Sequence, residues 1–278
     1  MKKRKPFSRA SVVKEASAAL EAVAPMTVRQ VYYRLVTAGV VPNTRSAYQF
    51  TSRALVEARR TGKIPWNKIE DRLRMPRTPA MWADLSDYVS DTIFCYRRDV
   101  WQTQPRLVEA WLEKDALSGI FEDVLARYGV TLNVGRGFDG WASIYNAAMR
   151  YKASGKPVSI LYFGDFDPSG EDMARSLAER LGSLGAVPEL VKCALSRADI
   201  DRYRLPPMMA KKSDTRAAAF IEKHGDVSVE LDALPTDVLR ARLVAEVEAR
   251  MDMTALAECR KLEEAERREL MRKLGEAE

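Results

Sequence analysis

From Pro105 to about residue 195, short apolar runs alternate with segments that have helical signals. Such an alternation predicts a parallel sheet with helices on both faces, joined by right-handed crossovers. If the strand order is 2-1-3-4, the first and third strands are neighbours where the order reverses, which is where sites lie in open parallel sheets. Ser169 and Asp172 are expected to form a capping box for the helix after the third run. The strand-like runs are 106–112, 130–135, 157–163 and 187–195.

Three carboxylates follow the first and third of these runs. Glu113 comes directly after the first run, and Asp165 and Asp167 follow the third in the sequence GDFDPSG. In an extended segment Asp165 and Asp167 point the same way, and Pro168 keeps residue 167 out of the helical region. Three carboxylates that converge repel one another unless a cation lies between them, and oxygen ligands suit Mg²⁺. The strand ends therefore predict a site for Mg²⁺ or Mn²⁺ held by Glu113, Asp165 and Asp167.

The positive charge of the chain is concentrated in its first 80 residues. These hold 17 Lys and Arg against 5 Asp and Glu, a balance of +12, so the remaining 198 residues sum to −6 within the total of +6. A basic region joined to an acidic one is typical of a DNA-binding module followed by a metal-binding module. A solvated basic surface would give the same composition.

The same basic region contains three helical patterns followed by a short extended segment. The helices are expected at 8–23, 28–39 and 47–62, and residues 63–73 are expected to form a β-ribbon. This order is that of a winged helix-turn-helix, a mostly helical DNA-binding fold. The side chains expected to face DNA phosphates are Arg53, Arg59, Arg60, Lys63 and Lys68.

Helical periodicity separates the two tyrosines of the second helix, which Thr27 is expected to cap. At about 100° per residue, Tyr32 lies with the apolar residues of the helix and is expected in the core. Tyr33 lies on the other side, four residues after Arg29, so these two side chains are expected to be neighbours on the surface. A surface tyrosine beside an arginine can attack a phosphodiester if a cation or base activates its phenol, or it can merely hydrogen-bond DNA. Periodicity leaves both roles open.

The histidine and cysteine content limits which side chains can carry out catalysis or bind a metal. His224 is the single histidine, and Cys95, Cys193 and Cys259 are far apart with no CxxC spacing. We therefore expect a reducing compartment, no thiolate zinc site, and catalysis by carboxylates, tyrosines, lysines or arginines. No apolar run approaches the roughly 20 residues that a membrane span needs, and the basic N-terminus lacks the apolar core of a secretory signal. The expected location is the cytoplasm, in association with the nucleoid.

Three of these segments, taken in order, resemble the A subunit of topoisomerase VI and the related meiotic double-strand-break protein. The resemblance extends over most of the chain. VRQVYY is similar to the catalytic-tyrosine segment of that family, which assigns the nucleophile to Tyr33 and its partner to Arg29. LEKDAL matches the glutamate segment of the family's Toprim domain at Glu113, and GDFDPSG matches its DxDPxG segment at Asp165 and Asp167.

The resemblance also implies a division of the chain and a set of partners. In place of the family's Gly-Pro-Asp sequence after the second Toprim strand, this chain has GRGFDG, with Asp139 as the candidate substitute. The family implies a homodimer on double-stranded DNA and a separate ATPase subunit of the B type, since no such ATPase module is recognised here. The expected regions are a winged-helix domain at 1–80, a linker at 81–104, a Toprim metal-binding domain at 105–232 and a helical C-terminal tail at 233–278.

The family chemistry is DNA cleavage by transesterification. Tyr33 of one subunit would attack a phosphodiester at the Toprim site of the other, leaving a 5′-phosphotyrosyl link and a free 3′ hydroxyl. Arg29 would stabilise the developing charge, and Glu113 would hold metal or exchange a proton with the leaving oxygen. Glu230 and Asp232, in VELDALPTDVL, either support the metal site or form a solvated helix entry. A metal-dependent nuclease and a non-catalytic DNA-binding protein remain as alternatives.

Overall fold

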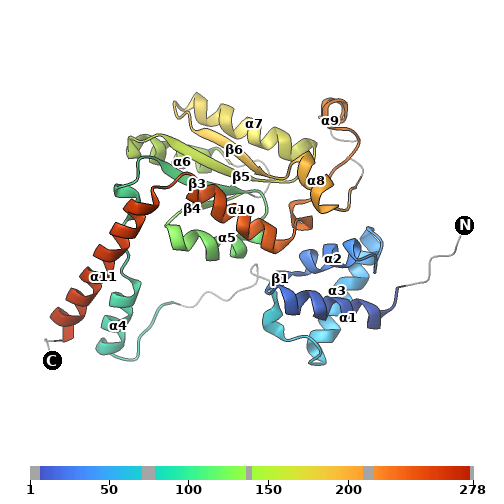
Figure 1. Ribbon diagram of the computed structural model, residues 1–278, viewed down its shortest axis with the longest axis horizontal. Coiled ribbons are helices and arrows are strands. Elements are labelled where there is room, and N and C mark those ends of the chain that lie inside the picture. The colour runs from blue at the N-terminus through green and yellow to red at the C-terminus, as the bar shows by residue number, and fades with distance from the viewer. Residues whose placement is uncertain (1–6, 71–78, 136–139, 209–215, 276–278) are drawn as a thin grey trace, which may run out of the picture.

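The computed structural model describes residues 7–70, 79–135, 140–208 and 216–275 (Figure 1). A helical N-terminal module lies beside a layered α/β region, and a pair of helices projects from that region on the side away from the module. The fold is thus mixed α/β with parallel strands, as the alternation of apolar runs predicted.

The α/β region is built on a four-stranded parallel sheet with the order β4-β3-β5-β6. In chain order within this region, that is the predicted order 2-1-3-4. Leu112 at the end of β3 pairs with Val134 on one side and with Phe163 on the other. The carboxyl ends of these three strands therefore lie at one edge of the sheet. The strands are β3 (Leu107–Leu112), β4 (Thr131–Val134), β5 (Val158–Phe163) and β6 (Glu189–Ala194).

Helices cover both faces of this sheet (Figure 1). Because successive side chains of a strand point to opposite faces, Leu112 packs with α5 and α10, whereas Trp111 packs with α6 and α7. All residues of β5 are buried, since this strand serves both layers. Helix α10 thus packs as part of the α/β layers, although the sequence placed it in a tail. The covering helices are α5 (Ser118–Leu125), α10 (Thr236–Glu248), α6 (Trp141–Ser154) and α7 (Pro168–Ser183).

Three helices and a short parallel strand pair form the N-terminal module. Thr27 caps α2 as predicted, since its hydroxyl oxygen accepts a hydrogen bond from the Gln30 amide (3.2 Å). In the part of the predicted β-ribbon that the structure describes, residues 63–70, the chain forms the 3₁₀ turn η1 and the short strand β2, which pairs in parallel with β1; residues 71–73 lie outside the described ranges. The elements are α1 (Arg9–Ala22), β1 (Met26–Thr27), α2 (Val28–Thr37), α3 (Arg45–Arg60), η1 (Trp66–Lys68) and β2 (Ile69–Glu70).

The projecting pair consists of α4 (Leu85–Cys95) and α11 (Met253–Gly275). The Tyr96 hydroxyl, just after α4, donates a hydrogen bond to Glu266 on α11 (2.7 Å). The expected linker at 81–104 therefore contains a helix that packs against the end of the chain. Within the described ranges, no helix combines the length and apolarity needed to cross a membrane. The short elements are η3 (Val100–Gln102), η4 (Asp115–Leu117), η5 (Ala126–Tyr128), α8 (Arg197–Tyr203), α9 (Ala217–His224) and η6 (Leu231–Ala233).

Candidate active site at the strand ends

The ends of β3 and β5 bring Glu113 and Asp165 together. The Glu113 amide donates to the Phe163 carbonyl (2.9 Å), which continues the sheet one residue beyond β3. Glu113 Oε2 in turn accepts a hydrogen bond from the Asp165 amide (2.9 Å). Burial, followed by repulsion from Asp165, raises the pKa of Glu113 to about 7, and burial also raises the pKa of Asp165. These two carboxylates lie together, as the strand order predicted.

Asp167 has a structural role at the start of α7. Its Oδ1 accepts a hydrogen bond from the Gly170 amide (2.7 Å), which makes Asp167 the N-cap of the helix. Pro168 then occupies the first helical position, where a missing N–H leaves no hydrogen bond unmade. The predicted cap at Ser169 is therefore wrong, because the proline starts the helix before that residue.

A segment distant in the sequence completes the site. Phe166 and Val229 form an antiparallel bridge with both N–H···O distances at 2.9 Å. This bridge fixes residues 230–232 beside the end of β5, and the Leu231 amide donates to Asp165 Oδ1 (2.7 Å). Of the two roles that the sequence left open for this segment, the solvated helix entry is therefore wrong.

The Lys114 ammonium lies among three carboxylates. Its Nζ is 2.7 Å from Asp232 Oδ2, 3.2 Å from Asp165 Oδ1 and 3.3 Å from Glu230 Oε2. The Lys114 side chain is 17% exposed and that of Asp232 1%, so the cluster is largely removed from water. Burial lowers the pKa of Lys114, but the carboxylates, Asp232 foremost, outweigh it and raise that pKa above its usual value. Lys114 was not among the predicted site residues, although it directly follows Glu113 in the chain.

Tyr33 is buried, and the predicted surface position is wrong. The residue is 5% exposed because the segment that carries Glu230 packs against α2. The Tyr33 hydroxyl donates to Glu230 Oε2 (3.2 Å), and Arg29 Nη1 donates to the same oxygen (2.6 Å). Burial, and then the Glu230 charge, raise the pKa of the Tyr33 phenol above its usual value. Tyr32 is buried in the core, as predicted.

The contact between the tyrosine and the strand-end cluster forms within one chain. Tyr33 and Lys114 both contact Glu230 Oε2, and Lys114 also contacts Asp165. The family resemblance instead placed the tyrosine at the site of a partner subunit. In this structure the cluster that links Tyr33 to Asp165 needs no second copy.

A cleft of about 700 Å³ opens beside this cluster, between the N-terminal module and the α/β region. Arg29 and Arg59 line it from the N-terminal module, and Lys114 and Asp232 line it from the α/β region. Glu70 and Asp115 line the cleft as well, so its three cations, Arg29, Arg59 and Lys114, are balanced by three carboxylates.

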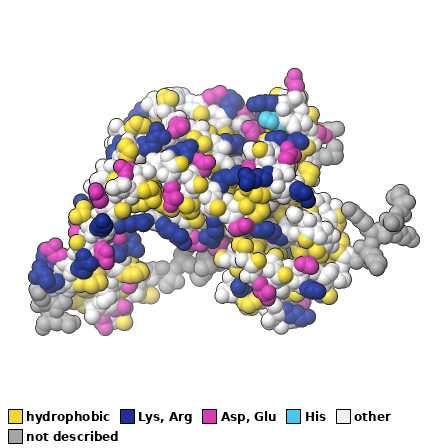
Figure 2. Space-filling view, viewed as in Figure 1, with side chains coloured by type: hydrophobic (Ala, Val, Ile, Leu, Met, Phe, Trp, Pro, Cys, Tyr) yellow, Lys and Arg dark blue, Asp and Glu magenta, His cyan; other side chains and the backbone are white. Residues whose placement is uncertain are grey.

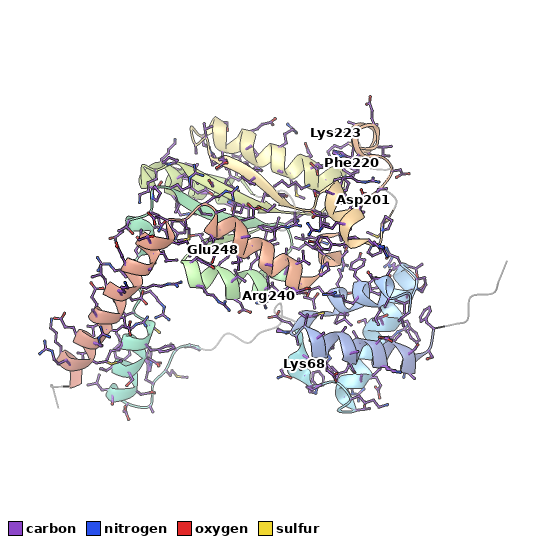
Figure 3. The ribbon with its side chains drawn as sticks, in the orientation of Figure 1. Lys68, Asp201, Phe220, Lys223, Arg240 and Glu248 are labelled. Atoms are coloured by element: carbon purple, nitrogen blue, oxygen red, sulfur yellow. The ribbon has the colours of Figure 1, made fainter. Side chains whose placement is uncertain are left out.

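Two of the five basic residues expected to contact DNA line different concavities. Arg59 lines the cleft and stacks on Trp66, with its guanidinium carbon 4.8 Å from the ring centroid. Lys63 lines a separate groove between α1 and α3. Only Arg59 of the five is therefore at the candidate site. The others on this module are Arg53 and Arg60, which are exposed, and Lys68, which is half-buried (Figure 3).

The carboxylates have the right chemistry for a hard cation but are not arranged around one. Among the described residues, no group of three or more His, Cys, Asp or Glu is placed to hold a metal ion. Glu113, Asp165 and Asp167 each use one oxygen to accept a backbone amide, which leaves the other for a cation. Asp232 Oδ1 is buried without a hydrogen-bond partner among these residues. Such an all-oxygen set fits Mg²⁺ or Mn²⁺; Asp139 lies outside the described ranges.

Two glycines of GDFDPSG give the site its close packing, and the sequence analysis assigned them no role. A Cβ at Gly164 would lie 2.7 Å from Glu113 Oε2. A Cβ at Gly170 would lie 2.4 Å from the Asp165 carbonyl oxygen. Gly164 thus lets Glu113 reach the end of β5, and Gly170 lets α7 pack on the Asp165 backbone. In the sequence, both glycines could have been recognised as site residues because they flank the two aspartates.

Replacing Gly170 by Ala is expected to lower the free energy of unfolding by about 1–3 kcal/mol, because a backbone oxygen cannot turn away from the new methyl group. Gly182 in the same helix is the matched control, since nothing lies within 4 Å of a Cβ placed there. Gly182→Ala is expected to raise the free energy of unfolding by about 0.5–1 kcal/mol through helix propensity. Urea denaturation measures both changes, and equal effects of the two substitutions would contradict the packing argument.

The raised pKa of Glu113 predicts a pH-dependent effect of Glu113→Gln. Because the pKa is higher in the folded state, the protonated carboxyl favours folding at low pH, and this contribution is lost as the pH rises through about 7. The glutamine variant stays neutral, so its stability relative to wild type is expected to rise by about 1–3 kcal/mol between about pH 5 and about pH 8. Denaturation with a chelator present measures the difference. A difference independent of pH would show that Glu113 is not buried as described.

The chain was compared with protein-family models and with curated protein sequences, and neither comparison found a match. The structure defines a mixed α/β protein with a cleft between its two parts. What this protein does is therefore inferred from its residues and their contacts.

Proposed function

We propose that this protein cleaves duplex DNA by tyrosine transesterification, as a relative of the topoisomerase VI A subunit with a winged-helix module and a Toprim domain. One observation carries the proposal. Tyr33 from the VRQVYY segment and Asp165 from GDFDPSG are far apart in sequence, yet Glu230 and Lys114 join them within hydrogen-bond distance. A nucleophile, two cations and a set of carboxylates therefore converge beside the cleft.

In the proposed reaction the Tyr33 oxygen attacks the phosphorus, forms the 5′-phosphotyrosyl bond and releases a 3′ hydroxyl. Glu230 Oε2, already hydrogen-bonded to the phenol, accepts its proton. Arg29 stabilises the charge that develops on the phosphate oxygens. Glu113, whose pKa is raised to about 7, either supplies a proton to the leaving oxygen or, once ionised, joins Asp165 and Asp167 as a metal ligand. Mg²⁺ held by Glu113, Asp165 and Asp167 would supply Lewis-acid stabilisation of the phosphate.

The phenol has to be uncovered before it can react. The contacts that cover it include ion pairs: Arg29 with Glu230 (2.6 Å) and Arg34 with Asp237 (3.0 Å). Phosphates that enter the cleft compete with Glu230 for Arg29 and so weaken this contact. The raised pKa of Tyr33 keeps the phenol unreactive until that competition takes place. DNA binding would thereby be coupled to exposure of the nucleophile.

The distribution of cations supports duplex DNA as the partner. Figure 2 shows Lys and Arg side chains along the hollow underside between α11 and the N-terminal module. Arg240, labelled in Figure 3, lies on α10 at this underside, and Arg127 and Arg260 are exposed on η5 and α11. A homodimer, a separate ATPase subunit of the B type and a nucleoid-associated location in the cytoplasm belong to the same proposal.

The test uses supercoiled plasmid with Mg²⁺ or Mn²⁺, stopped with detergent and compared with and without protease. We expect linear DNA that enters the gel only after protease treatment, because each end carries covalent protein. The burial of Tyr33 favours one alternative, a nuclease whose carboxylates activate water, and linear DNA indifferent to protease would indicate it. Salt-sensitive binding that survives loss of both Tyr33 and Glu113 would indicate a DNA-binding protein without catalysis.

A further inference from the structure

We propose that the exposed face of α6 is a stacking platform for an unpaired nucleobase beside the strand-end carboxylates. The inference rests on the proposed function and deepens it, because it names the class of DNA that the site prefers. That class is DNA with an unpaired or frayed nucleotide near the scissile bond.

Two large aromatic side chains on this face are exposed to solvent. Trp141, the first residue of α6, is 58% exposed, and Tyr145 is 51% exposed. Residues four apart lie on the same side of a helix, so both side chains belong to one side of α6. Large aromatic side chains usually bury most of their surface area inside a protein. Two neighbouring ones that stay exposed therefore indicate a surface that contacts a ligand or partner.

A cation connects this surface to the candidate active site. Arg180 on α7 places its guanidinium carbon 4.4 Å from the centroid of the Trp141 ring. Arg180 also lines a small cavity together with Glu113, Tyr162 and Gly135. Arg180 therefore contacts the indole and shares a small cavity with Glu113 at the end of β3.

The geometry favours a base over a duplex as the ligand. The Arg180 guanidinium lies against the indole, and 58% of Trp141 remains exposed, so a flat ligand can still contact it. Bases inside a duplex are covered on both faces by their neighbours, so only an unpaired or terminal base can stack on an open ring. Aromatic rings combined with arginine are the means by which proteins hold single-stranded nucleic acid.

The experiment measures binding of a fluorescent oligothymidylate and of a blunt duplex of equal length, with a chelator present so that no cleavage occurs. Trp141→Ala is expected to weaken binding of the single strand about tenfold and to leave duplex binding within about twofold of wild type. Trp141→Phe keeps a stacking ring and is expected to stay within about threefold of wild type on the single strand. Trp82→Ala is the matched control, because Trp82 is 41% exposed but precedes α4, in the projecting pair.

Unchanged affinity of Trp141→Ala for the single strand would overturn the inference and would leave this face as a protein contact. An equal loss in Trp82→Ala would overturn it too, since the effect would then not be local. Failure of the proposed function is seen separately, in the plasmid assay. If cleavage depends on protease but Trp141→Ala binds the single strand as wild type does, only the proposed stacking site is refuted. If Trp141→Ala weakens that binding but no covalent cleavage is seen, only the proposed transesterification is refuted.

Discussion

Tyr33→Phe is expected to abolish covalent DNA cleavage, with a loss of at least about a thousandfold, because the substitution removes the attacking oxygen and leaves the ring. The phenylalanine fills the same buried position and forfeits one hydrogen bond, to Glu230. The free energy of unfolding should therefore fall by no more than about 1 kcal/mol. The two measurements are protease-dependent linear DNA from supercoiled plasmid and urea denaturation of the same preparation.

Tyr32→Phe is the matched control for this experiment. Tyr32 is the neighbouring residue, is equally buried, and loses its hydroxyl contact with the Thr44 amide (2.9 Å) rather than one at the candidate site. It is expected to retain cleavage in proportion to the folded protein. Full cleavage by Tyr33→Phe would contradict the transesterase and would leave the carboxylate-dependent nuclease as the better explanation.

Lys114→Met is expected to lower the free energy of unfolding by about 3–5 kcal/mol, because it removes the buried cation and leaves its carboxylate partners. Lys114 Nζ lies within 3.3 Å of all three carboxylates, and Asp232 among them is 1% exposed and cannot be hydrated instead. Methionine matches the length of the lysine stem, so little of the loss comes from packing. Burial already raises the pKa of Asp165 and Lys114 opposes that rise, so without Lys114 the Asp165 carboxyl is protonated more readily and the deficit should shrink as the pH falls.

Two further variants separate charge from packing in this cluster. Lys223→Met removes an exposed lysine on α9 (Figure 3) and is expected to change stability by less than about 0.5 kcal/mol. Adding Asp232→Asn to Lys114→Met removes the most buried of the unpaired charges and should recover part of the loss. A pH-independent deficit with no recovery in the double variant would show that Lys114 acts by filling space.

Several features of the fold followed from the sequence because their causes are local. The apolar runs near Leu112 and Phe163 are short and bounded by turn residues, so strands were predicted in the right places. The alternation of strands with helices implied a parallel sheet, and the order of that sheet placed Glu113 next to Asp165. Tyr32 lay on the apolar face of its helix and is buried. Each of these depends on periodicity or on rules of chain connection.

The features that the sequence did not predict correctly have a different cause. Helical periodicity reports which face of α2 is apolar, but it does not report what covers the polar face, so the burial of Tyr33 was not predictable. Its partner Glu230 is 197 residues away. Lys114 was likewise passed over, because it pairs across 118 residues with Asp232. The capping role of Asp167 at the start of α7 was also not predicted.

By itself, the sequence determined the strands, their parallel order and the carboxylates at their ends, since apolar periodicity and turn residues act over a few positions. Only the tertiary structure decided that the segment around Glu230 returns to the end of β5 through the Phe166–Val229 bridge. That return buries the phenol, sets the ammonium of Lys114 among three carboxylates and joins the N-terminal module to the sheet. The physical reason is that contacts between distant segments form where packing and charge pairing favour them, and no local pattern encodes that choice.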